Sequence, residues 1–296
     1  MNSTTTMKGH WSKEWYNDLL FATWNCFSYS NERHQYCQGL GFDILALTEL
    51  HGRQLEVEQS KRWVVSAKGC SSDPASGVGI LLSARMARKM ASSGSIGSRI
   101  VWVRVITPVC PIFFVCVYIP HKHRRQAPYA TDVLAQLDEL LATVAPGDCV
   151  IIAGDLNCQL QRNVPGCTGQ WAMTTRSEKQ GHDNLVLDLM RAYDLFAIDT
   201  LFRPKGKMWG NKRRVCNATY MPKDVDRRPT RLDYFLVSNR RKAMAVSSEV
   251  KWAPSLHRFG GPDKFDHGMV KVRWRCRLRA SRVTPRRDYE SMGVKE

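Results

Sequence analysis

The sequence predicts a single domain of the mixed α/β class, and three observations lead to this prediction. Short β-rich runs recur along most of the 296 residues, and several are continuously apolar, as expected of strands covered on both faces. Two longer segments between these runs carry apolar residues at helical spacing. No internal repeat, low-complexity tract or Pro/Gly-rich linker divides the chain. One mixed α/β domain is therefore the simplest arrangement.

Nine segments are expected to form strands, because each is rich in apolar, β-branched or aromatic residues. In chain order they are residues 20–25, 43–50, 62–68, 77–83, 100–106, 112–118, 148–154, 231–238 and 269–278. The last of them alternates strictly between apolar residues and five cations, Lys271, Arg273, Arg275, Arg277 and Arg279. Period-two alternation puts these cations on one face. Two interpretations stay open: a charged strand that discourages edge pairing, or a strip that faces DNA.

Two helices are predicted with clear ends. In residues 128–144, Pro128 suits a first helical turn, and Pro146-Gly147 ends the apolar periodicity. Residues 184–194 carry a similar stripe, and a weaker helix is expected around 31–40. Both stripes are expected to pack into the core. The predicted domain covers residues 19–279, between a flexible N-terminal segment, 1–18, and a basic C-terminal tail or linker, 280–296.

The chain is strongly basic. Its 44 lysines and arginines outnumber 27 acidic residues, which gives a net charge of +17. A globular chain of this charge is expected to meet a polyanion, with nucleic acid the first candidate and an anionic membrane surface the second. The longest apolar run, IFFVCVYIP, is far too short to cross a bilayer.

The ten cysteines are scattered and form no CxxC pair, so a zinc module is not indicated. Their use favours a reducing compartment. The N-terminal stretch has no apolar core of a secretory signal. We therefore expect a nuclear or cytoplasmic protein that is not secreted.

Polar side chains recur at the ends of the predicted strands. They are Asn25, Glu49, Asp155, Asn157, Asp233, Asp266 and His267. Taken singly, each has a structural explanation, since Asp and Asn after a strand often form a turn by bonding their own backbone. If the strands form one sheet system, however, these side chains converge at one rim. Such oxygen donors suit Mg²⁺, with Mn²⁺ as the alternative. A histidine beside the ion suits a general base, and Asp233 is its candidate partner.

The ordered motifs WN, LTE, VYIP, GDLN, RLDYFLVS and FDH resemble those of the endonuclease/exonuclease/phosphatase superfamily, over about residues 20–275. Within it, the stretch ATYMPKDVDRRPTRLDYFLVSNR is most similar to the apurinic-type endonuclease domains of non-LTR (LINE-type) retrotransposons and to exonuclease III-like enzymes. The resemblance implies a four-layer α-β-β-α sandwich, in which two packed mixed β-sheets are flanked by helices and the site lies at one rim.

The resemblance also implies roles for the motif residues. Glu49 is the expected principal metal ligand, assisted by Asn25 and Asp266. The remaining motif residues are expected to act on the phosphate and the attacking water: Asp155 orients or deprotonates the water, Asn157 donates to a phosphate oxygen, His267 pairs with Asp233, and Tyr118 assists the phosphate or the leaving oxygen. Whether Asp155 or His267 is the general base stays open.

Three positions depart from the family pattern. Phe265 replaces the usual serine before Asp-His, and Phe27 follows WNC where repair enzymes tend to carry an acid. The second departure argues against abasic-site repair and leaves general nicking untouched. His121 stands where a small polar residue is common, and it is expected either to contact phosphate or to lie in a loop.

Basic residues surround an aromatic one in 202–214, where Lys212, Arg213 and Arg214 follow Trp209. In the retrotransposon enzymes a loop in this neighbourhood reaches DNA, and cations with an aromatic wedge are suitable parts. The alternative is a solvated loop. The following Thr219 and Tyr220 belong to the TY motif and are also expected to contact nucleic acid.

These expectations combine into a Mg²⁺-dependent endonuclease that nicks one strand of double-stranded DNA and leaves a 3′-OH primer for reverse transcription. Its partners would be double-stranded DNA and a reverse transcriptase domain of the natural polyprotein. The alternatives are an exonuclease III-like repair nuclease, an RNA phosphodiesterase or a phosphoinositide phosphatase, which the LDY and TY signatures disfavour. An alternative of another class is a catalytically inactive nucleic-acid-binding domain.

Overall fold

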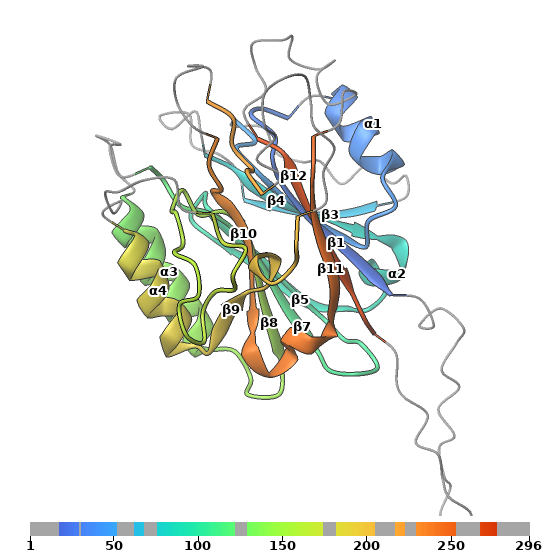
Figure 1. Cartoon of the computed structure of the whole chain (residues 1–296). Helices are drawn as coiled ribbons and strands as arrows, with labels where there is room; N and C mark the ends of the chain where they lie inside the picture. Colours follow the sequence, from blue (N-terminus) through green and yellow to red (C-terminus); the bar gives the residue numbers. More distant parts are fainter. Residues whose placement is uncertain are drawn as a thin grey trace, which may run out of the picture.

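Two six-stranded β-sheets pack face to face in the computed structural model (Figure 1). The structure describes residues 18–29, 31–51, 62–67, 76–121, 129–173, 182–204, 217–222, 229–252 and 267–276. Within these residues one sheet is built from the first four and the last two strands of the chain, and the other sheet from the six strands between them.

The first sheet, sheet A, has the strand order β11-β12-β1-β2-β4-β3. Its strands are β1 (Leu19–Asn25), β2 (Ile44–Thr48), β3 (Arg62–Ala67), β4 (Val78–Ser83), β11 (Ala245–Lys251) and β12 (Met269–Trp274). The β1–β2 pair is parallel and the other pairs are antiparallel. Sheet A is therefore mixed, and its parallel pair delivers two strand ends to one rim.

The second sheet, sheet B, has the order β5-β6-β7-β8-β10-β9. Its strands are β5 (Met90–Ile96), β6 (Ile100–Val105), β7 (Ile112–Tyr118), β8 (Cys149–Asp155), β9 (Leu195–Ala197) and β10 (Asp233–Ser238). Only the β7–β8 pair is parallel. Sheet B thus also has one parallel pair, whose ends reach the same rim as those of β1 and β2.

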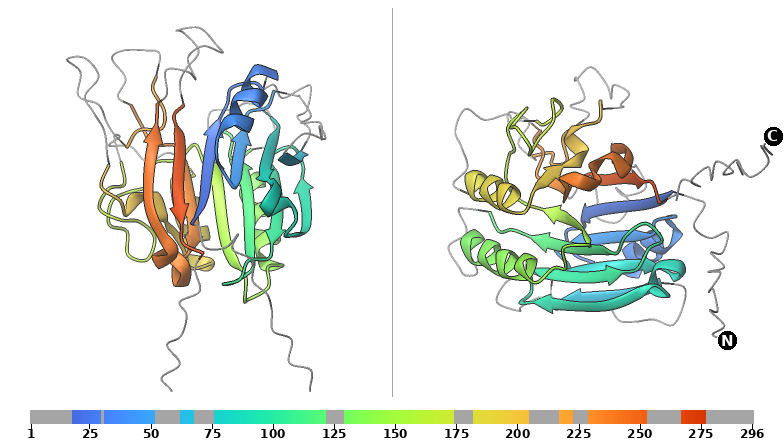
Figure 2. Two further views of the ribbon diagram at one scale, coloured as in Figure 1. Left: turned by 90° about the vertical axis from the view of Figure 1, so that its right-hand side faces the viewer. Right: turned by 90° about the horizontal axis from the view of Figure 1, so that it is seen from below.

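Helices cover the outer face of each sheet (Figure 2). They are α1 (Asn31–Gly39), the short α2 (Ala84–Ala87), α3 (Ala130–Ala142) and α4 (Asp183–Ala192), with 3₁₀ turns at Ile198–Thr200 and Asn239–Met244. The apolar stripes of α3 and α4 pack on β7, β8 and β10, whereas Cys37 of α1 packs on β1 and β2. The four-layer α-β-β-α sandwich expected from the resemblance is confirmed.

The central core lies between the two sheets and is closed by aromatic contacts. Phe21 of sheet A meets Phe114 of sheet B edge to face at 5.8 Å between ring centroids. Phe114 in turn lies 6.4 Å from Phe235. Each of these rings is almost fully buried, and burying one apolar side chain of this kind stabilises a fold by roughly 1.5–3 kcal/mol. This packing fixes the sheets relative to one another.

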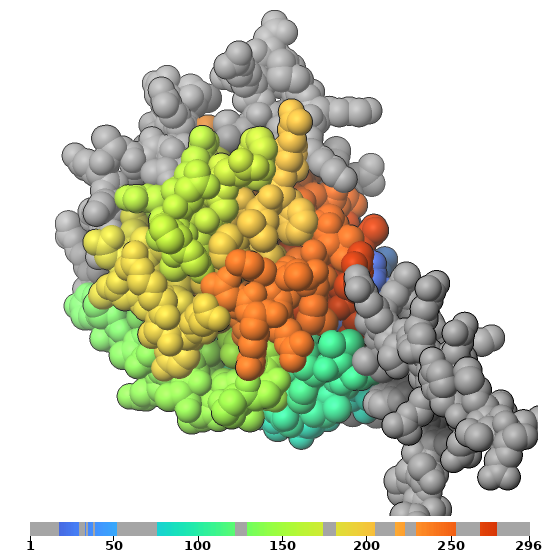
Figure 3. Space-filling view, turned by 60° about the horizontal axis from the view of Figure 1, so that its bottom comes forward, coloured from blue at the N-terminus to red at the C-terminus, as the bar shows by residue number. Residues whose placement is uncertain are grey.

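The end of the sandwich where β8 begins is closed by polar contacts. Asp148, just before β8, accepts from Arg104 Nε at 2.6 Å, and Arg240 Nη2 donates to the Asp148 carbonyl oxygen at 2.7 Å. The segment Asn239–Met244 is in view at this end in Figure 3. The opposite rim, where β7 and β8 end, holds the candidate site.

All nine predicted strands and the three predicted helices are present, with ends shifted by a few residues. Three strands were not predicted: β5, β9 and β11. The charged strand predicted at residues 269–278 does not lie at a sheet edge, because β12 pairs with both β1 and β11. Its Lys271 donates to Glu249 of β11 at 3.0 Å, so this cation balances a neighbouring charge within the sheet.

The eight cysteines in the part of the chain that the structure describes are free and buried. In the same part, no helix is long and apolar enough to span a bilayer. Residues 1–17 and 277–296, which include almost all of the two expected terminal segments, lie outside the described residues.

Candidate active site

Three side chains of the site come from one row of sheet B. The register pairs Tyr118 with Asp155 across the parallel β7–β8 pair, and Asp155 with Asp233 across the antiparallel β8–β10 pair. In-register neighbours on adjacent strands point to the same face. The three side chains therefore lie side by side, on the face of sheet B that is turned toward sheet A.

The glycine before Asp155 is required by the close approach of β7. Gly154 pairs with Val117, and a Cβ on Gly154 would overlap the carbonyl oxygen of Val117. Its φ of +154° is also unfavourable for other residues. In the GD dipeptide, Gly154 thus allows β8 to lie close to β7, and Asp155 supplies the carboxylate at the end of β8.

The Asp155–Asn157 segment is both a turn and part of the site. Asn157 has a φ of +46°, which Asn tolerates better than most residues. Its backbone N–H donates to Asp155 Oδ1 at 2.9 Å, and its Nδ2 donates to the Ile119 carbonyl oxygen at 3.0 Å. The turn uses one carboxylate oxygen of Asp155 and leaves the other, Oδ2, facing the centre of the site.

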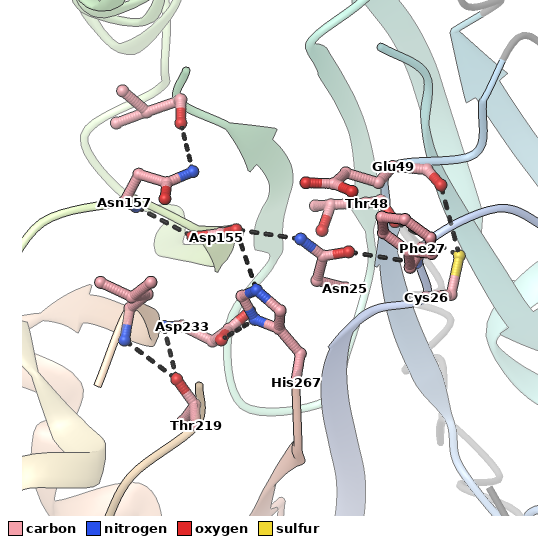
Figure 4. A network of polar contacts seen from close by, with 12 residues as sticks. Asn25, Cys26, Phe27, Thr48, Glu49, Asp155, Asn157, Thr219, Asp233 and His267 are labelled. Carbon is pink, nitrogen blue, oxygen red and sulfur yellow. Dashed lines mark hydrogen bonds and ion pairs between the residues drawn. The ribbon is translucent and has the colours of Figure 1, made fainter. Parts of the chain in front are cut away.

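Sheet A contributes Asn25 and Glu49 from the ends of its parallel pair. Asn25 is the last residue of β1, and Glu49 directly follows β2. Asn25 Nδ2 donates to Asp155 Oδ2 at 3.0 Å, which joins the two sheets at the rim (Figure 4). The Glu49 carboxylate interacts with Asn25 and with Tyr118. Residues from both sheets therefore form one connected polar cluster.

His267 completes the cluster from just before β12. Its Nδ1 lies 2.8 Å from Asp233 Oδ2, and its Nε2 lies 3.9 Å from Asp155 Oδ2 (Figure 4). A carboxylate at Nδ1 favours the tautomer with the proton on Nδ1, which leaves an acceptor lone pair on Nε2. His267 and both aspartates are buried. The distance between His267 Nε2 and Asp155 Oδ2 is too long for a hydrogen bond. The two atoms are therefore not paired with each other, and both can act on one substrate atom.

Thr219 and Tyr220 lie beside this pair. Thr219 is fully buried, and its hydroxyl accepts from the backbone N–H groups of Leu232 and Asp233 at 2.9 and 3.0 Å. These contacts position the start of β10, and the expected contact of Thr219 with nucleic acid stays a prediction. The ring of Tyr220 lies 5.1 Å from that of His267 and is partly exposed.

Several predicted site residues belong to segments outside the described part of the chain. Asp266, Trp209, Lys212, Arg213 and Arg214 lie outside the described residues, as does Phe265. His121 is described and partly exposed, three residues after Tyr118, so it lies near the rim that holds the site.

Burial and clustered charge change the acidities of the site. Burial raises the pKa of Asp155, and the nearby charges of Asp233 and Glu49 raise it further. Burial likewise raises the pKa of Tyr118, together with the charges of Glu49 and Asp155. For Glu49, burial raises the pKa, but hydrogen bonding to His51 and the charge of His267 outweigh it, so its pKa is lowered. The charges of Asp233 and Glu49 therefore oppose the ionisation of Asp155.

The donor set fits a hard divalent cation. Asp233 Oδ1 is buried without a hydrogen-bond partner among the described residues, and a buried polar atom of this kind normally has one. Asp155, Asp233 and His267 each offer a ligand atom, all within 4.8 Å of one another. Glu49 and Asn25 add a carboxylate and an amide on the sheet A side. Oxygen ligands of this type match Mg²⁺ or Mn²⁺.

A buried ion pair next to the site was not predicted from the sequence. Arg231 Nη2 lies 2.7 Å from Asp199 Oδ2, and both side chains are buried. Asp199 also accepts from the Phe235 N–H at 2.8 Å, and Arg231 donates to the Asn217 carbonyl oxygen at 3.0 Å. This ion pair holds the segments on both sides of Asp233. Arg231 begins the RLDYFLVS motif, but its sequence gives no indication of the partner, because Asp199 lies outside that motif.

Comparison with known proteins gives one family. The model of the "Endonuclease/Exonuclease/phosphatase family" matches residues 22–255. No curated protein matches the sequence.

Similar solved structures include two nucleases and one phosphatase. The 3′ phosphatase NExo from Neisseria, bound to a product DNA hairpin, has a TM-score of 0.62 at 16% identity, over 86% of this chain and 99% of its own. An AP endonuclease from Archaeoglobus fulgidus has a TM-score of 0.62 at 15% identity, with the same coverage of 86% and 99%. The AP endonuclease LMAP from Leishmania major has a TM-score of 0.62 at 17% identity, over 88% of each chain. These likenesses concern the fold.

Proposed function

The chain belongs to the endonuclease/exonuclease/phosphatase family, and on this premise we propose that it is a Mg²⁺-dependent DNA endonuclease that nicks one strand of a duplex. The observation that carries the proposal is the placement of His267 Nε2 opposite Asp155 Oδ2 at 3.9 Å, next to Asn25 and Glu49. A base, its orienting carboxylate and a set of oxygen donors at one rim are the parts that phosphodiester hydrolysis needs.

In the proposed reaction, water attacks the phosphorus in line with the leaving oxygen. A bond forms between the water oxygen and phosphorus, and the bond between phosphorus and the 3′ oxygen breaks. The proton of the water passes to the acceptor pair formed by His267 Nε2 and Asp155 Oδ2. The leaving oxygen takes up a proton and becomes a 3′-OH. The other end of the nicked strand carries the 5′-phosphate. Asp233 keeps His267 in the tautomer that this step requires.

Glu49 and Asn25 are the residues that would hold the cation, with Asp266 as a further ligand. When bound, a divalent ion offsets the negative charge that develops on the phosphoryl oxygens. Asn157 Nδ2 and the Tyr118 hydroxyl flank Asp155 at the same rim, where they orient the phosphate through hydrogen bonds. Orientation of this kind lowers the barrier without changing the chemistry.

DNA is supported as the substrate by charge and by the nature of similar folds. The net charge of +17 favours a polyanion. Two of the similar structures are AP endonucleases, and a third is a phosphatase bound to a DNA hairpin. His121, Lys212, Arg213 and Arg214 are proposed to contact phosphates, Trp209 is proposed to act as the aromatic wedge, and Tyr220 is proposed to contact DNA beside His267.

The biological role that we propose follows from the sequence resemblance to non-LTR retrotransposon endonucleases. The 3′-OH left by the nick would prime reverse transcription at the target site by a polymerase domain of the same polyprotein. Such a protein would act in the nucleus or cytoplasm.

A plasmid-nicking assay tests the proposed activity. Wild-type protein is expected to convert supercoiled DNA to the open-circular form in Mg²⁺, and a chelator is expected to stop the reaction. The Glu49→Ala and His267→Ala variants are expected to lose at least about 100-fold in rate, the usual contribution of a general base or a charge-stabilising group. Ligation of the nick after the reaction checks for a 3′-OH beside a 5′-phosphate.

Binding without cleavage would contradict the proposal. If wild-type protein binds duplex DNA equally with and without Mg²⁺ and does not nick it, the chain is a nucleic-acid-binding domain instead. The Ile106→Ala variant is a matched control, because Ile106 is exposed near the end of the sandwich opposite the site, and its rate should equal that of wild type.

A further inference from the structure

Phe27 and His51 form an aromatic pair at the edge of the site. Their ring centroids lie 5.0 Å apart with an interplanar angle of 66°, an edge-to-face arrangement. Phe27 is 39% exposed, which makes it one of the few large apolar side chains exposed in the described residues. A single exposed apolar residue needs no explanation, but this one is held in place by an unusual amount of structure.

The loops that carry the pair have strained backbones. Phe27 and Ser28 have φ values of +41° and +80°, and Glu49 and His51 have values of +57° and +53°. Left-handed conformations cost non-glycine residues of order 1 kcal/mol or more each and cluster at functional sites. Four residues with left-handed backbone angles lie in these two adjacent loops. Their strain indicates that the position of the Phe27–His51 pair costs the folded state some stability.

Buried polar contacts hold these loops rigidly. The guanidinium of Arg33, from α1, donates to the carbonyl oxygens of Cys26, Phe27 and Ser28. Ser28 N–H donates to the Glu49 carbonyl oxygen at 2.7 Å, which joins the two loops to each other. The Phe27 ring is therefore presented from a rigid base.

The pair also contacts the proposed cation ligands directly. The Phe27 N–H donates to Asn25 Oδ1 at 3.2 Å, and His51 Nε2 lies 3.4 Å from Glu49 Oε2. Figure 4 shows Phe27 beside Glu49 and Asn25, on the sheet A side of the site and away from Asp155 and Asn157. A substrate phosphate at the site would thus have the aromatic pair next to one of its two flanking nucleotides.

We propose that Phe27, supported by His51, is a stacking platform for the base of the nucleotide that flanks the scissile phosphate on the sheet A side. This inference rests on the proposed DNA endonuclease activity and adds a substrate contact to it. An uncharged ring without hydrogen-bonding groups is unsuited to phosphate, whereas every base has a π-face that stacks on aromatic side chains. The platform would hold that base out of the duplex stack and so help to orient the strand.

Substitutions at Phe27 test the platform. Base stacking on an aromatic residue is worth about 1–3 kcal/mol, so Phe27→Ala and Phe27→Leu are expected to raise KM for a defined duplex by roughly 5- to 150-fold, with kcat nearly unchanged, as for uniform binding. Phe27→Trp is expected to stay close to wild type. Phe27→Leu keeps the apolar bulk, so it separates stacking from packing. The Ile106→Ala variant again provides the control for an exposed apolar residue.

A fluorescent base locates the contact. 2-Aminopurine is placed in turn on each side of the mapped nick site, and binding is followed with Ca²⁺ in place of Mg²⁺. Wild type and Phe27→Trp are expected to change the fluorescence at one flanking position only, and Phe27→Ala is expected to abolish that change. An unchanged KM for Phe27→Ala, or the same fluorescence change as in wild type, would overturn the inference. Absence of nicking by wild-type protein would instead reject the proposed function itself, so the two failures are distinguishable.

Discussion

Asn25 Nδ2 donates a 3.0 Å hydrogen bond to Asp155 Oδ2, and this bond joins residues of the two sheets that are 130 positions apart in the chain. It is buried, and its acceptor also faces His267. The bond therefore links the half of the site that belongs to sheet A with the half that belongs to sheet B. Each half is fixed by the strand register of its own sheet. The Asn25–Asp155 hydrogen bond therefore forms only when the two sheets are aligned as catalysis requires.

Removing the amide of Asn25 should uncouple the two halves. The Asn25→Leu variant keeps most of the side-chain volume but leaves Asp155 Oδ2 without its donor. We expect the nicking rate to fall by about 100-fold or more, as when a group that orients or stabilises a reacting centre is lost. Single-turnover kinetics measures the loss, and circular dichroism checks the fold.

The matched control for Asn25 is Thr23, two residues earlier on β1. Its hydroxyl is buried and has no hydrogen-bond partner among the described residues. Thr23→Val should therefore leave the nicking rate unchanged. Equal losses in Thr23→Val and Asn25→Leu would mean that β1 tolerates no change, and the role assigned to the amide would then have to be abandoned.

The His267–Asp233 pair should control the tautomer of the imidazole. In Asp233→Asn, the amide can donate to Nδ1, which would move the histidine proton to Nε2 and remove its acceptor lone pair. We expect a loss of roughly 10²- to 10⁴-fold in single-turnover rate, by analogy with other His-Asp pairs. Binding of duplex DNA should remain close to wild type, which a gel-shift titration at fixed salt can check.

Thr219→Val distinguishes positioning from chemistry at the same pair. The substitution leaves the N–H groups of Leu232 and Asp233 without their acceptor, at a cost of about 1–3 kcal/mol for each unsatisfied buried group. We expect reduced stability and a smaller rate loss than in Asp233→Asn. A Thr219→Val variant with wild-type stability that binds DNA poorly would instead support the nucleic-acid contact expected from the sequence.

The fold could be predicted to the extent that burial leaves a pattern in the sequence. Most strands inside the sheets are largely apolar, β12 alternates between apolar residues and cations, and all of them were found, whereas β5, β9 and β11 were not. All three lie at sheet edges. β5 is mostly exposed and polar, β11 is half-polar, and β9 has only three residues. These three strands form because a neighbouring strand supplies backbone hydrogen-bond partners. Their own residues therefore do not predict them.

The site could be predicted where its residues follow buried strands. Asn25 and Asp155 were found in this way, because a polar residue ending an apolar run is conspicuous, and Asp233 was found as an acid inside the predicted strand 231–238. The supporting groups were not found, because their function depends on contacts between distant segments. Arg231 and Asp199 form their ion pair across 32 residues of chain, and neither stands out locally. The Phe27 platform depends on left-handed backbone angles, for which the sequence carries no glycine signal.

Gly154 should tolerate no side chain. In Gly154→Ala, the new Cβ would overlap the Val117 carbonyl oxygen and force β7 and β8 apart. We expect a loss of more than about 1 kcal/mol in the free energy of unfolding, because the backbone conformation and the space both exclude alanine. Urea denaturation measures the loss. A Cβ added to Gly147 would have no other heavy atom within 4 Å, so Gly147→Ala should be neutral or slightly stabilising. Similar losses in both variants would refute the steric explanation.

Arg231 should contribute to stability chiefly by neutralising Asp199. The ion pair is buried, with 2.7 Å between Arg231 Nη2 and Asp199 Oδ2. In Arg231→Met, the carboxylate would stay buried without its partner, and we expect a loss of about 3–5 kcal/mol at neutral pH. The double variant Arg231→Met/Asp199→Leu should recover most of this loss, because it removes the unpaired charge.

The same pair predicts how the loss depends on pH. Burial raises the pKa of Asp199 above its ordinary value of 3.8, although Arg231 lowers it. Without Arg231 the pKa rises further, so the folded variant holds the proton more tightly than the unfolded chain does. A group of this kind stabilises the folded state below its unfolded pKa, and that stability is lost as pH rises through the folded pKa. The defect of Arg231→Met should therefore shrink as pH falls toward about 4. Urea denaturation of wild type and variant at both pH values tests this, and a defect that is constant with pH would show that lost packing, and not the unpaired carboxylate, causes the instability.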